Sequence, residues 1–592
     1  MPLKIPIPNH TVGRVKNISV PTKEFAERNR PVSLLVAFVL AGLLVLALIV
    51  PLILAIGKGF LHDGQLSGYW FARLISNEVL VGQLFNSLLL ACVTTLVCLL
   101  LAVPLAVLRV RCRFFGQGLL GMAILAPMIL PPFVGALSMR RLFSQFGVVN
   151  LLLERLGVLD FRQGLGPDWL GSGFPAVVVL QVLHLFPILY LNASAALANV
   201  DPTYAQAARN LGAGPIRTFF KITLPLMRPG LFAGATIVFI WSFTDIGTPL
   251  IIGYENLTPI TIFKELARAD IGGRTYALVF IMLSSSVGLY ILGKFIFGRT
   301  LAAESSKASV ATETKRLGPI GTLAAWLLFA GVLILALVPH IGVILVAVSG
   351  RWVNTILPSE YTLRHLAFVV TDPATYSSII NSLKYAGVST IMDIISGFMI
   401  AWLVIRTKVR GRTALDGLAM LPLAVPGLIL AAGYVALTAS GPLAAIGPTR
   451  NPFVILVVAY AVRRIPFVVR GVAAGLQQVP VSLEEAARNL GATRRRTLLR
   501  ITVPLIAANI IAASVLTFAF AMLEVSDSLI LAQTQQYYPM TKQIYNLATS
   551  TGSPETAKQA AALGVYGMVL LAGTMALASA LLGRRLGAMF RA

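Results

Sequence analysis

Twelve long apolar runs constrain the fold of this sequence more than any other feature. Each run has about 19 residues or more, the length that an α-helix needs to cross a bilayer. Only 12% of the 592 residues are charged and the mean hydropathy is +0.82, whereas an average soluble domain is about 25% charged. A soluble fold is therefore excluded. The sequence predicts an all-α integral membrane protein of about 12 transmembrane helices, near residues 32–57, 82–108, 117–138, 174–198, 230–253, 275–298, 319–349, 378–405, 415–438, 452–476, 508–532 and 560–583.

The basic residues indicate how these helices are oriented. The formal net charge is +25, and the basic residues lie in short segments between the apolar runs, not in one patch of the kind that binds nucleic acid. Six of them precede the first run, which is too long to be the core of a cleavable signal. With the N-terminus inside, the cytoplasmic segments hold thirty Lys and Arg residues and the outer segments about half as many. By the positive-inside rule, both termini are expected in the cytoplasm, and no nucleic-acid partner is predicted.

The chain is expected to consist of two related halves. Residues 1–31 form a polar N-terminal segment, and a second polar stretch, 299–318, has the composition of a linker between the halves 32–298 and 319–592. Because this linker is cytoplasmic, both halves have the same orientation, as in a parallel repeat. The first half carries an additional outer segment, 142–160, whose pattern predicts an amphipathic surface helix.

One cytoplasmic loop occurs in both halves. Residues 207–226 and 486–505 agree at thirteen of twenty positions, which hydrophobicity alone does not impose on a loop. Each copy predicts a short helix, a glycine turn in the left-handed conformation, and a second helical stretch with a proline before the next span. The paired alanines allow a partner surface to approach closely. The residues that define the loop are Ala207, Ala208, Gly212 and Pro225 in the first copy and Ala486, Ala487, Gly491 and Pro504 in the second.

The second copy resembles the EAA motif of the permeases of binding-protein-dependent ABC importers. Glu485-Ala-Ala, Gly491 and the segment Ile501-Thr-Val-Pro504 have the spacing of that motif, whereas the first copy has Gln206 in place of the usual Glu. The resemblance covers both halves and is similar to the fused permeases of the ferric iron, phosphonate and thiamine type. It implies the type I ABC importer permease fold, with two parallel six-helix halves, in the inner (plasma) membrane of a bacterial cell.

The same resemblance implies the partners of the chain. In that family the motif forms a coupling helix that sits in a groove of each cytoplasmic ATPase subunit. Two ATPase copies, which bind ATP and Mg, and a periplasmic or lipid-anchored solute-binding protein are therefore implied, with the lipid bilayer around the permease. The implied coupling residues are Gln206, Ala207, Ala208, Gly212, Pro225, Glu485, Ala486, Ala487, Gly491 and Pro504.

The chain itself has no complete Walker motif, no catalytic cluster and no paired His or Cys spacing. The sequence therefore predicts a transport subunit without its own cofactor, not an enzyme, and assigns no metal site. An ion-coupled secondary transporter can also have two parallel six-helix halves. That alternative gives no reason to retain two copies of a docking loop.

Ionisable residues within the apolar runs are candidates for the substrate pathway, because each costs roughly 2.5 to 3.5 kcal/mol on insertion scales. When the fifth runs of the two halves are aligned, Asp245 lies opposite Glu524 and Thr248 opposite Asp527. These residues either line a pathway or pair with basic residues for packing. The tenth run contains two adjacent arginines, which either bind an anion or neutralise the two acids of the second half: Arg463 and Arg464. Trp241 and Phe243 are expected to pack.

The substrate is not fixed by these residues. Acids along a pathway suit a ferric ion or a cationic amine such as a polyamine or thiamine, whereas paired arginines suit a phosphonate, a phosphate ester or a chelated ferric anion. Ferric iron is the first expectation, and it rests on the family resemblance alone.

Overall fold

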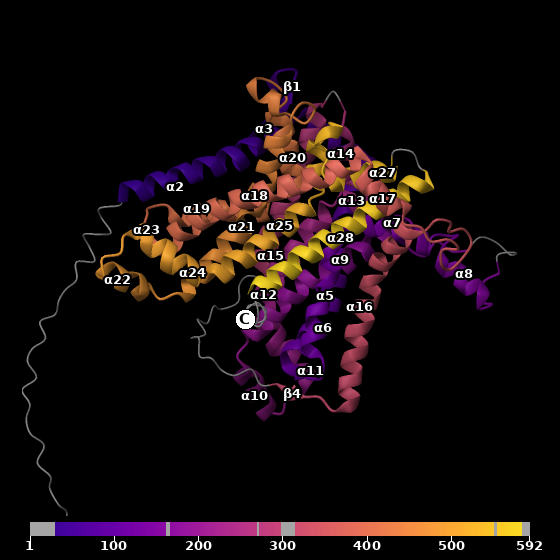
Figure 1. The fold of residues 1–592 in the computed structure, drawn as a ribbon, viewed down its shortest axis with the longest axis horizontal. Coiled ribbons are helices and arrows are strands. Elements are labelled where there is room, and N and C mark those ends of the chain that lie inside the picture. The colour runs from indigo at the N-terminus through magenta and orange to yellow at the C-terminus, as the bar shows by residue number, and fades with distance from the viewer. Residues whose placement is uncertain (1–29, 161–165, 269–270, 298–313, 550–552, 583–592) are drawn as a thin grey trace, which may run out of the picture.

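The computed structural model describes residues 30–160, 166–268, 271–297, 314–549 and 553–582. This part of the chain is a bundle of long helices with two pairs of two-residue strands (Figure 1). The predicted N-terminal segment 1–31 and the predicted linker 299–318 lie mostly outside the described residues.

Eight helical spans in the described ranges are long and apolar enough to cross a membrane, and three bent helix pairs raise the number to eleven. The tenth predicted span corresponds to α21 (Phe453–Gln478), which is not among the eleven. This helix carries three arginines, and it is nevertheless mostly buried within the bundle. A buried basic helix in a membrane protein marks a functional region, because its charges need partners inside the protein.

The two halves present the same order of long helices. The elements of the first half are α2 (Arg30–Leu44), α3 (Val50–Gly59), β1 (Leu61–His62), β2 (Gln65–Leu66), α4 (Tyr69–Ile75), α5 (Glu78–Arg111), β3 (Cys112–Arg113), α6 (Gln117–Ala123), α7 (Pro132–Phe143), α8 (Val148–Arg155), α9 (Gly173–Ala198), α10 (Pro202–Asn210), α11 (Pro215–Thr218), α12 (Leu224–Phe243), α13 (Gly247–Ile252), α14 (Thr258–Leu266) and α15 (Gly273–Phe297). The elements of the second half are β4 (Lys315–Arg316), α16 (Pro319–Val348), α17 (Arg364–Thr371), α18 (Pro373–Arg406), α19 (Arg412–Met420), α20 (Gly427–Leu437), α21, α22 (Val481–Asn489), α23 (Arg494–Thr497), α24 (Val503–Leu505), α25 (Ala507–Met522), α26 (Ser526–Leu531), α27 (Met540–Thr549) and α28 (Pro554–Leu582).

Four predicted spans are not continuous helices, and this corrects the sequence-based expectation. The spans 117–138 and 415–438 bend by 89° and 102°, at segments in which prolines remove backbone donors and block a regular helix. The spans 230–253 and 508–532 end as long helices at Phe243 and Met522 and restart as the short helices α13 and α26. Each of these last two breaks contains one of the predicted pathway acids.

The first helix of each half packs against the opposite half. In the N-terminal span α2–α3, the carbonyl oxygen of Ala47 accepts a 2.7 Å hydrogen bond from the Tyr434 hydroxyl of α20. In α16, the carbonyl oxygen of Pro339 accepts a 3.0 Å hydrogen bond from the Ser138 hydroxyl of α7. The halves divide at the linker in sequence, but in space they exchange their first helices, and the largest hydrophobic core contains residues of both halves.

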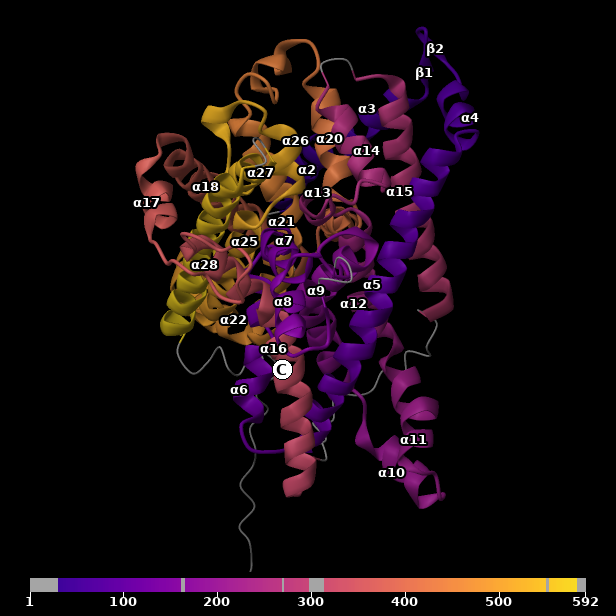
Figure 2. The same cartoon turned by 90° about the vertical axis from the view of Figure 1, so that its right-hand side faces the viewer.

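The repeated loops project from the body of the bundle. Helices α10–α11 lie at the bottom and α22–α24 at the left of Figure 1, away from α8, α14 and α17. Figure 2 shows α10 and α11 at the bottom of the view, where the lower end of α16 also lies. The strand β4, at the described end of the linker, pairs with β3 of the first half. The outer segment 142–160 contains α8, as its pattern predicts, and Leu152 and Leu156 of that segment are exposed.

Candidate translocation pathway and docking loops

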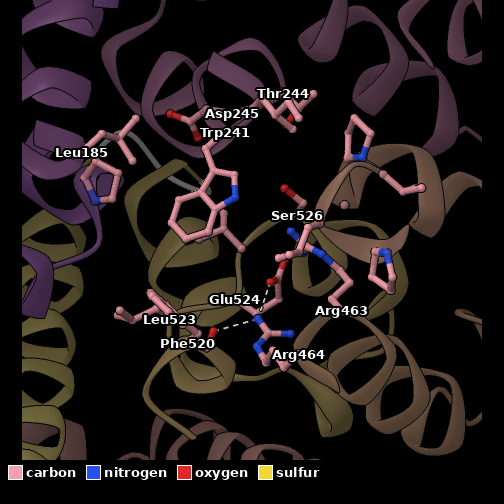
Figure 3. Close-up of a pocket in the computed structure, with 18 of the residues that line it drawn as sticks. Leu185, Trp241, Thr244, Asp245, Arg463, Arg464, Phe520, Leu523, Glu524 and Ser526 are labelled. Atoms are coloured by element: carbon pink, nitrogen blue, oxygen red, sulfur yellow. Dashed lines mark hydrogen bonds and ion pairs between the residues drawn. The ribbon is translucent and has the colours of Figure 1, made fainter. Parts of the chain in front are cut away.

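A polar cavity of about 170 Å³ lies between the two halves, and both contribute to its wall (Figure 3). The first half provides residues of α9 and of the end of α12, and the second half provides residues of α21, of the end of α25 and of the segment before α20. Four of the six predicted pathway residues line it: Asp245, Arg463, Arg464 and Glu524. Thr248 and Asp527 are fully buried behind the wall and do not line the cavity.

The two helix breaks place the cavity acids. The Asp245 carboxylate accepts hydrogen bonds from the backbone N–H groups of Gly247, at 3.0 Å, and Thr248, at 3.4 Å. The Glu524 carboxylate accepts a 3.2 Å hydrogen bond from the backbone N–H of Asp527. Each acid therefore caps the N-terminus of a short inner helix, α13 or α26, where unpaired N–H groups and the helix dipole stabilise negative charge.

In the first half, neutral groups hold the acid. The Gln181 amide of α9 donates a 3.0 Å hydrogen bond to the Asp245 carboxylate. The Gln181 carbonyl oxygen accepts hydrogen bonds from Ser242, at 2.5 Å, and from Thr94, at 3.3 Å, which fixes the direction of the amide. No Lys, Arg or His of the described chain lies within ion-pair distance of Asp245.

In the second half, cations hold the acids. The Arg463 guanidinium lies 2.5 Å from a Glu524 carboxylate oxygen and 3.1 Å from one of Asp527. Arg464 pairs with the other Glu524 oxygen and donates hydrogen bonds to the carbonyl oxygens of Phe520, at 2.7 Å, and Tyr460, at 3.0 Å. The sequence left open whether the arginines bind an anion or neutralise the acids, and in this structure they neutralise the acids.

Two wall residues that the sequence did not single out contact the charged side chains of the cavity. Gln181 occupies the position of Tyr460 when the loop offset between the halves is applied, so a helix-by-helix alignment could have found it. Gly427 allows the Arg463 guanidinium to lie against the backbone, because a Cβ at this position would be 2.3 Å from an Arg463 nitrogen. Trp241 and Phe243 were expected to pack. Trp241 contacts Phe520 edge-on, with ring centroids 5.6 Å apart, and also lines the cavity, whereas Phe243 is buried.

Both repeated loops have the helix–turn–helix form that their sequences predict. The turn glycines adopt the left-handed conformation, with φ +81° at Gly212 and +83° at Gly491. At the start of the first loop, the backbone N–H of Thr203 donates a 2.9 Å hydrogen bond to Asp201, which lowers the pKa of that carboxyl below its usual value.

The alanine pairs of these loops face two directions. Ala207 and Ala486 point outward with their neighbours Gln206 and Glu485, whereas Ala208 and Ala487 are buried under the loops. The residues just before the turns, Leu211 and Leu490, are 88% and 89% exposed. An apolar side chain this exposed, on a loop with a predicted docking role, is suited to a groove in a partner protein.

The second loop is anchored to the bundle by a buried ion pair. The Arg406 guanidinium, at the end of α18, lies 3.0 Å from a Glu484 carboxylate oxygen and donates a 2.8 Å hydrogen bond to the carbonyl oxygen of Val479. Glu484 is 2% exposed. In the first loop the equivalent position is Ala205. The acid that fixes the loop is therefore Glu484, whereas the motif acid Glu485 is exposed.

We expect Glu484→Gln to loosen the second loop, because it leaves the Arg406 charge buried without its partner, at a cost of about 3–5 kcal/mol. Limited proteolysis of the membrane-embedded protein should then cut faster within residues 481–500. Asp416→Asn is the control, because Asp416 pairs with the exposed Arg470 at 3.2 Å and such pairs contribute about 1 kcal/mol or less. Equal cleavage of the wild type and the Glu484 variant would contradict the anchoring role.

Two related halves, exchanged first helices and a shared polar cavity define a membrane permease. The sequence model of the family described as "binding-protein-dependent transport system inner membrane component" matches residues 68–302 and 393–591. The chain belongs to this family, as the resemblance in the repeated loop predicted. Neither matched range includes the exchanged helices α2–α3 and α16.

Two of the relatives match most of the chain, and a third matches less than half of it. A putative ferric transport system permease protein of Haemophilus influenzae is 28% identical over 84% of this chain and 79% of its own length. The ferric transport system permease protein of Actinobacillus pleuropneumoniae is 26% identical over 82% and 69%. A probable molybdenum ABC transporter permease protein of Haloferax volcanii is 35% identical over 43% of this chain and 86% of its own length.

Proposed function

We propose that this chain is the permease of an ATP-driven importer that moves ferric iron from a binding protein outside the inner membrane into the cytoplasm. Two copies of a cytoplasmic ATPase dock on the repeated loops and supply the energy, and both termini lie on the same cytoplasmic side. The two ferric permeases among the relatives, which align over most of this chain, support the substrate.

The observation that carries the proposal is the charge balance of the cavity. Arg463 and Arg464 carry two positive charges, which Glu524 and Asp527 balance at ion-pair distance. Asp245, on the opposite wall, adds a negative charge that no cation of the described chain pairs. An unpaired carboxylate in a pathway attracts a hard cation such as ferric iron, for which oxygen ligands are suited.

Anionic substrates such as molybdate or a phosphonate are the second candidate, because the molybdenum permease of Haloferax volcanii and a putative 2-aminoethylphosphonate permease of Salmonella typhimurium align to part of the chain. An anion would use the two arginines. Both are already bound to acids in this structure, so this candidate requires the ion pairs to open first.

A transport experiment tests the substrate. The permease is reconstituted in vesicles with its ATPase and binding protein, and ATP-dependent uptake of radioactive iron is measured beside that of molybdate and of 2-aminoethylphosphonate. We expect uptake of iron alone. Uptake of either anion without iron would overturn the proposal.

Asp245→Asn should reduce iron uptake by about tenfold or more, because it removes a charge-assisted contact from the pathway. The amide oxygen can still accept hydrogen bonds from the backbone N–H groups of Gly247 and Thr248, and only the oxygen that accepts from Gln181 is replaced, so the fold is expected to persist. The initial uptake rate checks this, with the affinity of the binding protein for iron as the unchanged reference. Asp168→Asn is the matched control, since Asp168 lies outside the cavity and accepts hydrogen bonds from Ser172 and Gly171 just before α9. Uptake at the wild-type rate would remove Asp245 from the pathway.

A further inference from the structure

One further acid is buried in the membrane-spanning part of the protein, away from the cavity wall. Asp393 lies in the middle of α18 and is 0% exposed. Within the described chain, neither of its carboxylate oxygens has a hydrogen-bond partner. A buried carboxyl group without a partner is costly and is therefore a functional candidate.

Asp393 lies next to the arginine-bearing helix α21. Helices α18 and α21 run in the same direction, because Tyr385 contacts Phe453 and, further along both helices, Gly397 meets Val468. A Cβ at Gly397 would be 2.8 Å from the Cβ of Val468, so the helices are in close contact there. Asp393 and Arg464 each lie four residues, about one turn, before this close contact on their own helix.

Arg464 has one donor that is not used. Its two terminal nitrogens bond Glu524, Phe520 and Tyr460, whereas its Nε has no acceptor among the described residues. The arginine is 4% exposed, so water does not readily replace that acceptor. Two neighbouring helices thus carry an unused donor and an unused pair of acceptors.

The other half shows that packing alone does not require an acid here. With the offset of the Asn-Ser-Leu segments, the first-half equivalent of Asp393 is Cys98. Cys98 is also 0% exposed, and its thiol lies 3.8 Å from the carbonyl oxygen of Val182 on α9. A small neutral side chain is therefore sufficient at this position, and the half with the acid is the half with the arginines.

We propose that Asp393 is a second acceptor for Arg464: the guanidinium bonds Glu524 in the conformation described here and Asp393 in another conformation of the transport cycle. The exchange leaves Glu524 with Arg463 only. The cavity then carries additional negative charge in one conformation and not in the other. Such a two-position contact is a means by which a conformational change alters the affinity of a site.

This inference rests on the proposed function, because the added negative charge assists a cation. In this scheme Asp393 is a positioning residue. It acts through Arg464 and does not touch the transported ion.

The test uses the permease assembled with its ATPase and binding protein, and two variants, Asp393→Asn and Asp393→Cys. Iron uptake should fall by about tenfold or more in both, as expected for loss of a charge-assisted contact. Without nucleotide, the complexes of both variants should melt at no lower temperature than the wild-type complex, since the Asp393 carboxyl is unpaired in that state. Their melting temperature should fall when a non-hydrolysable ATP analogue holds the complex in the other conformation. Asp416→Asn, which removes an acid at the cytoplasmic end, should leave uptake and both melting temperatures at their wild-type values.

Wild-type uptake by both variants would overturn the inference. Equal lowering of the two melting temperatures would also overturn it, because that result indicates a purely structural role. If the wild type transports another solute in place of iron, the proposed substrate is wrong. The exchange of Arg464 is still tested, because it predicts that the Asp393 variants lose melting temperature with the ATP analogue and not without nucleotide.

Discussion

Replacing Gly491 with valine should abolish ATP-driven uptake while the permease remains in the membrane. Gly491 has φ +83°, a conformation that costs a residue with a Cβ roughly 1–2 kcal/mol and a β-branched residue more. The turn must therefore change, and the angle between α22 and α23 changes with it. Because Leu490 is exposed beside this turn, a new angle displaces the surface that we propose for the ATPase groove.

The expected result is uncoupling, not unfolding. Uptake should fall to the background level, and ATP hydrolysis by the assembled complex should no longer respond to the loaded binding protein. Gly214→Ala is the matched control, because Gly214 is a loop glycine with φ −63° and open space around its Cβ position. Normal uptake by the Gly491 variant with ATPases bound would show that the loop is not the docking element.

The two loops should not be equally sensitive. Gly212→Val changes an equivalent turn, at φ +81°, but the first loop has Gln206 in place of the motif acid and Ala205 in place of the anchoring Glu484. A loop without an equivalent of the Arg406–Glu484 ion pair adjusts more readily to a changed turn. We therefore expect a smaller loss of uptake than for Gly491→Val, measured in the same vesicles.

The repeated loops could be predicted because their signals are local. A glycine that accepts a left-handed conformation and a proline at a fixed distance specify a turn wherever they occur. The sequence could not show which side chains of these loops point into the protein and which point outward. Glu484 and Glu485 are adjacent acids, and the one that becomes buried is the one that faces Arg406 at the end of a helix about 80 residues earlier.

The helix breaks were missed for a different reason. Windows of apolar residues measure length and hydropathy, but they contain no information on the path of the backbone. The prolines at 127, 131 and 132 in the first half, and those at 422 and 426 in the second, were the available signals for the bends of 89° and 102°. The breaks after Phe243 and Met522 have no such proline before them. At these two breaks the available signal is the acid that caps the next short helix.

The composition of the cavity was predictable only in part. Alignment of the halves paired Asp245 with Glu524, and the structure brings both to one cavity. Whether Arg463 and Arg464 were available to an anion depended on the distance between α21 and α25, which no periodicity determines. Asp393 escaped notice because its equivalent in the first half is a cysteine, so the alignment of the halves gave no repeated acid.

Neutralising one member of the Arg464–Glu524 pair should destabilise the permease more than neutralising both. Glu524→Gln leaves Arg463 and Arg464 with one acid, Asp527, and Arg464→Met leaves Glu524 and Asp527 with one arginine. Either single change breaks a buried pair and leaves an uncompensated charge, at about 3–5 kcal/mol. The double variant retains Arg463 and Asp527, which lie 3.1 Å apart and balance each other, so its melting temperature should return close to the wild-type value.

Measurements of iron uptake should show whether the Arg464–Glu524 pair takes part in transport or only stabilises the fold. Glu524→Gln should lower uptake by about tenfold or more, because it removes a carboxylate from the cavity and leaves excess positive charge that repels a cation. We expect the double variant to recover stability but not uptake, since the negative charge that assists the cation and the donor that moves to Asp393 are both absent. A double-mutant cycle in reconstituted vesicles, with melting temperature and initial uptake rate measured for all four proteins, gives the coupling in each quantity. Recovery of both quantities in the double variant would make the pair structural only, and normal uptake by both single variants would remove Arg464 and Glu524 from the transport mechanism.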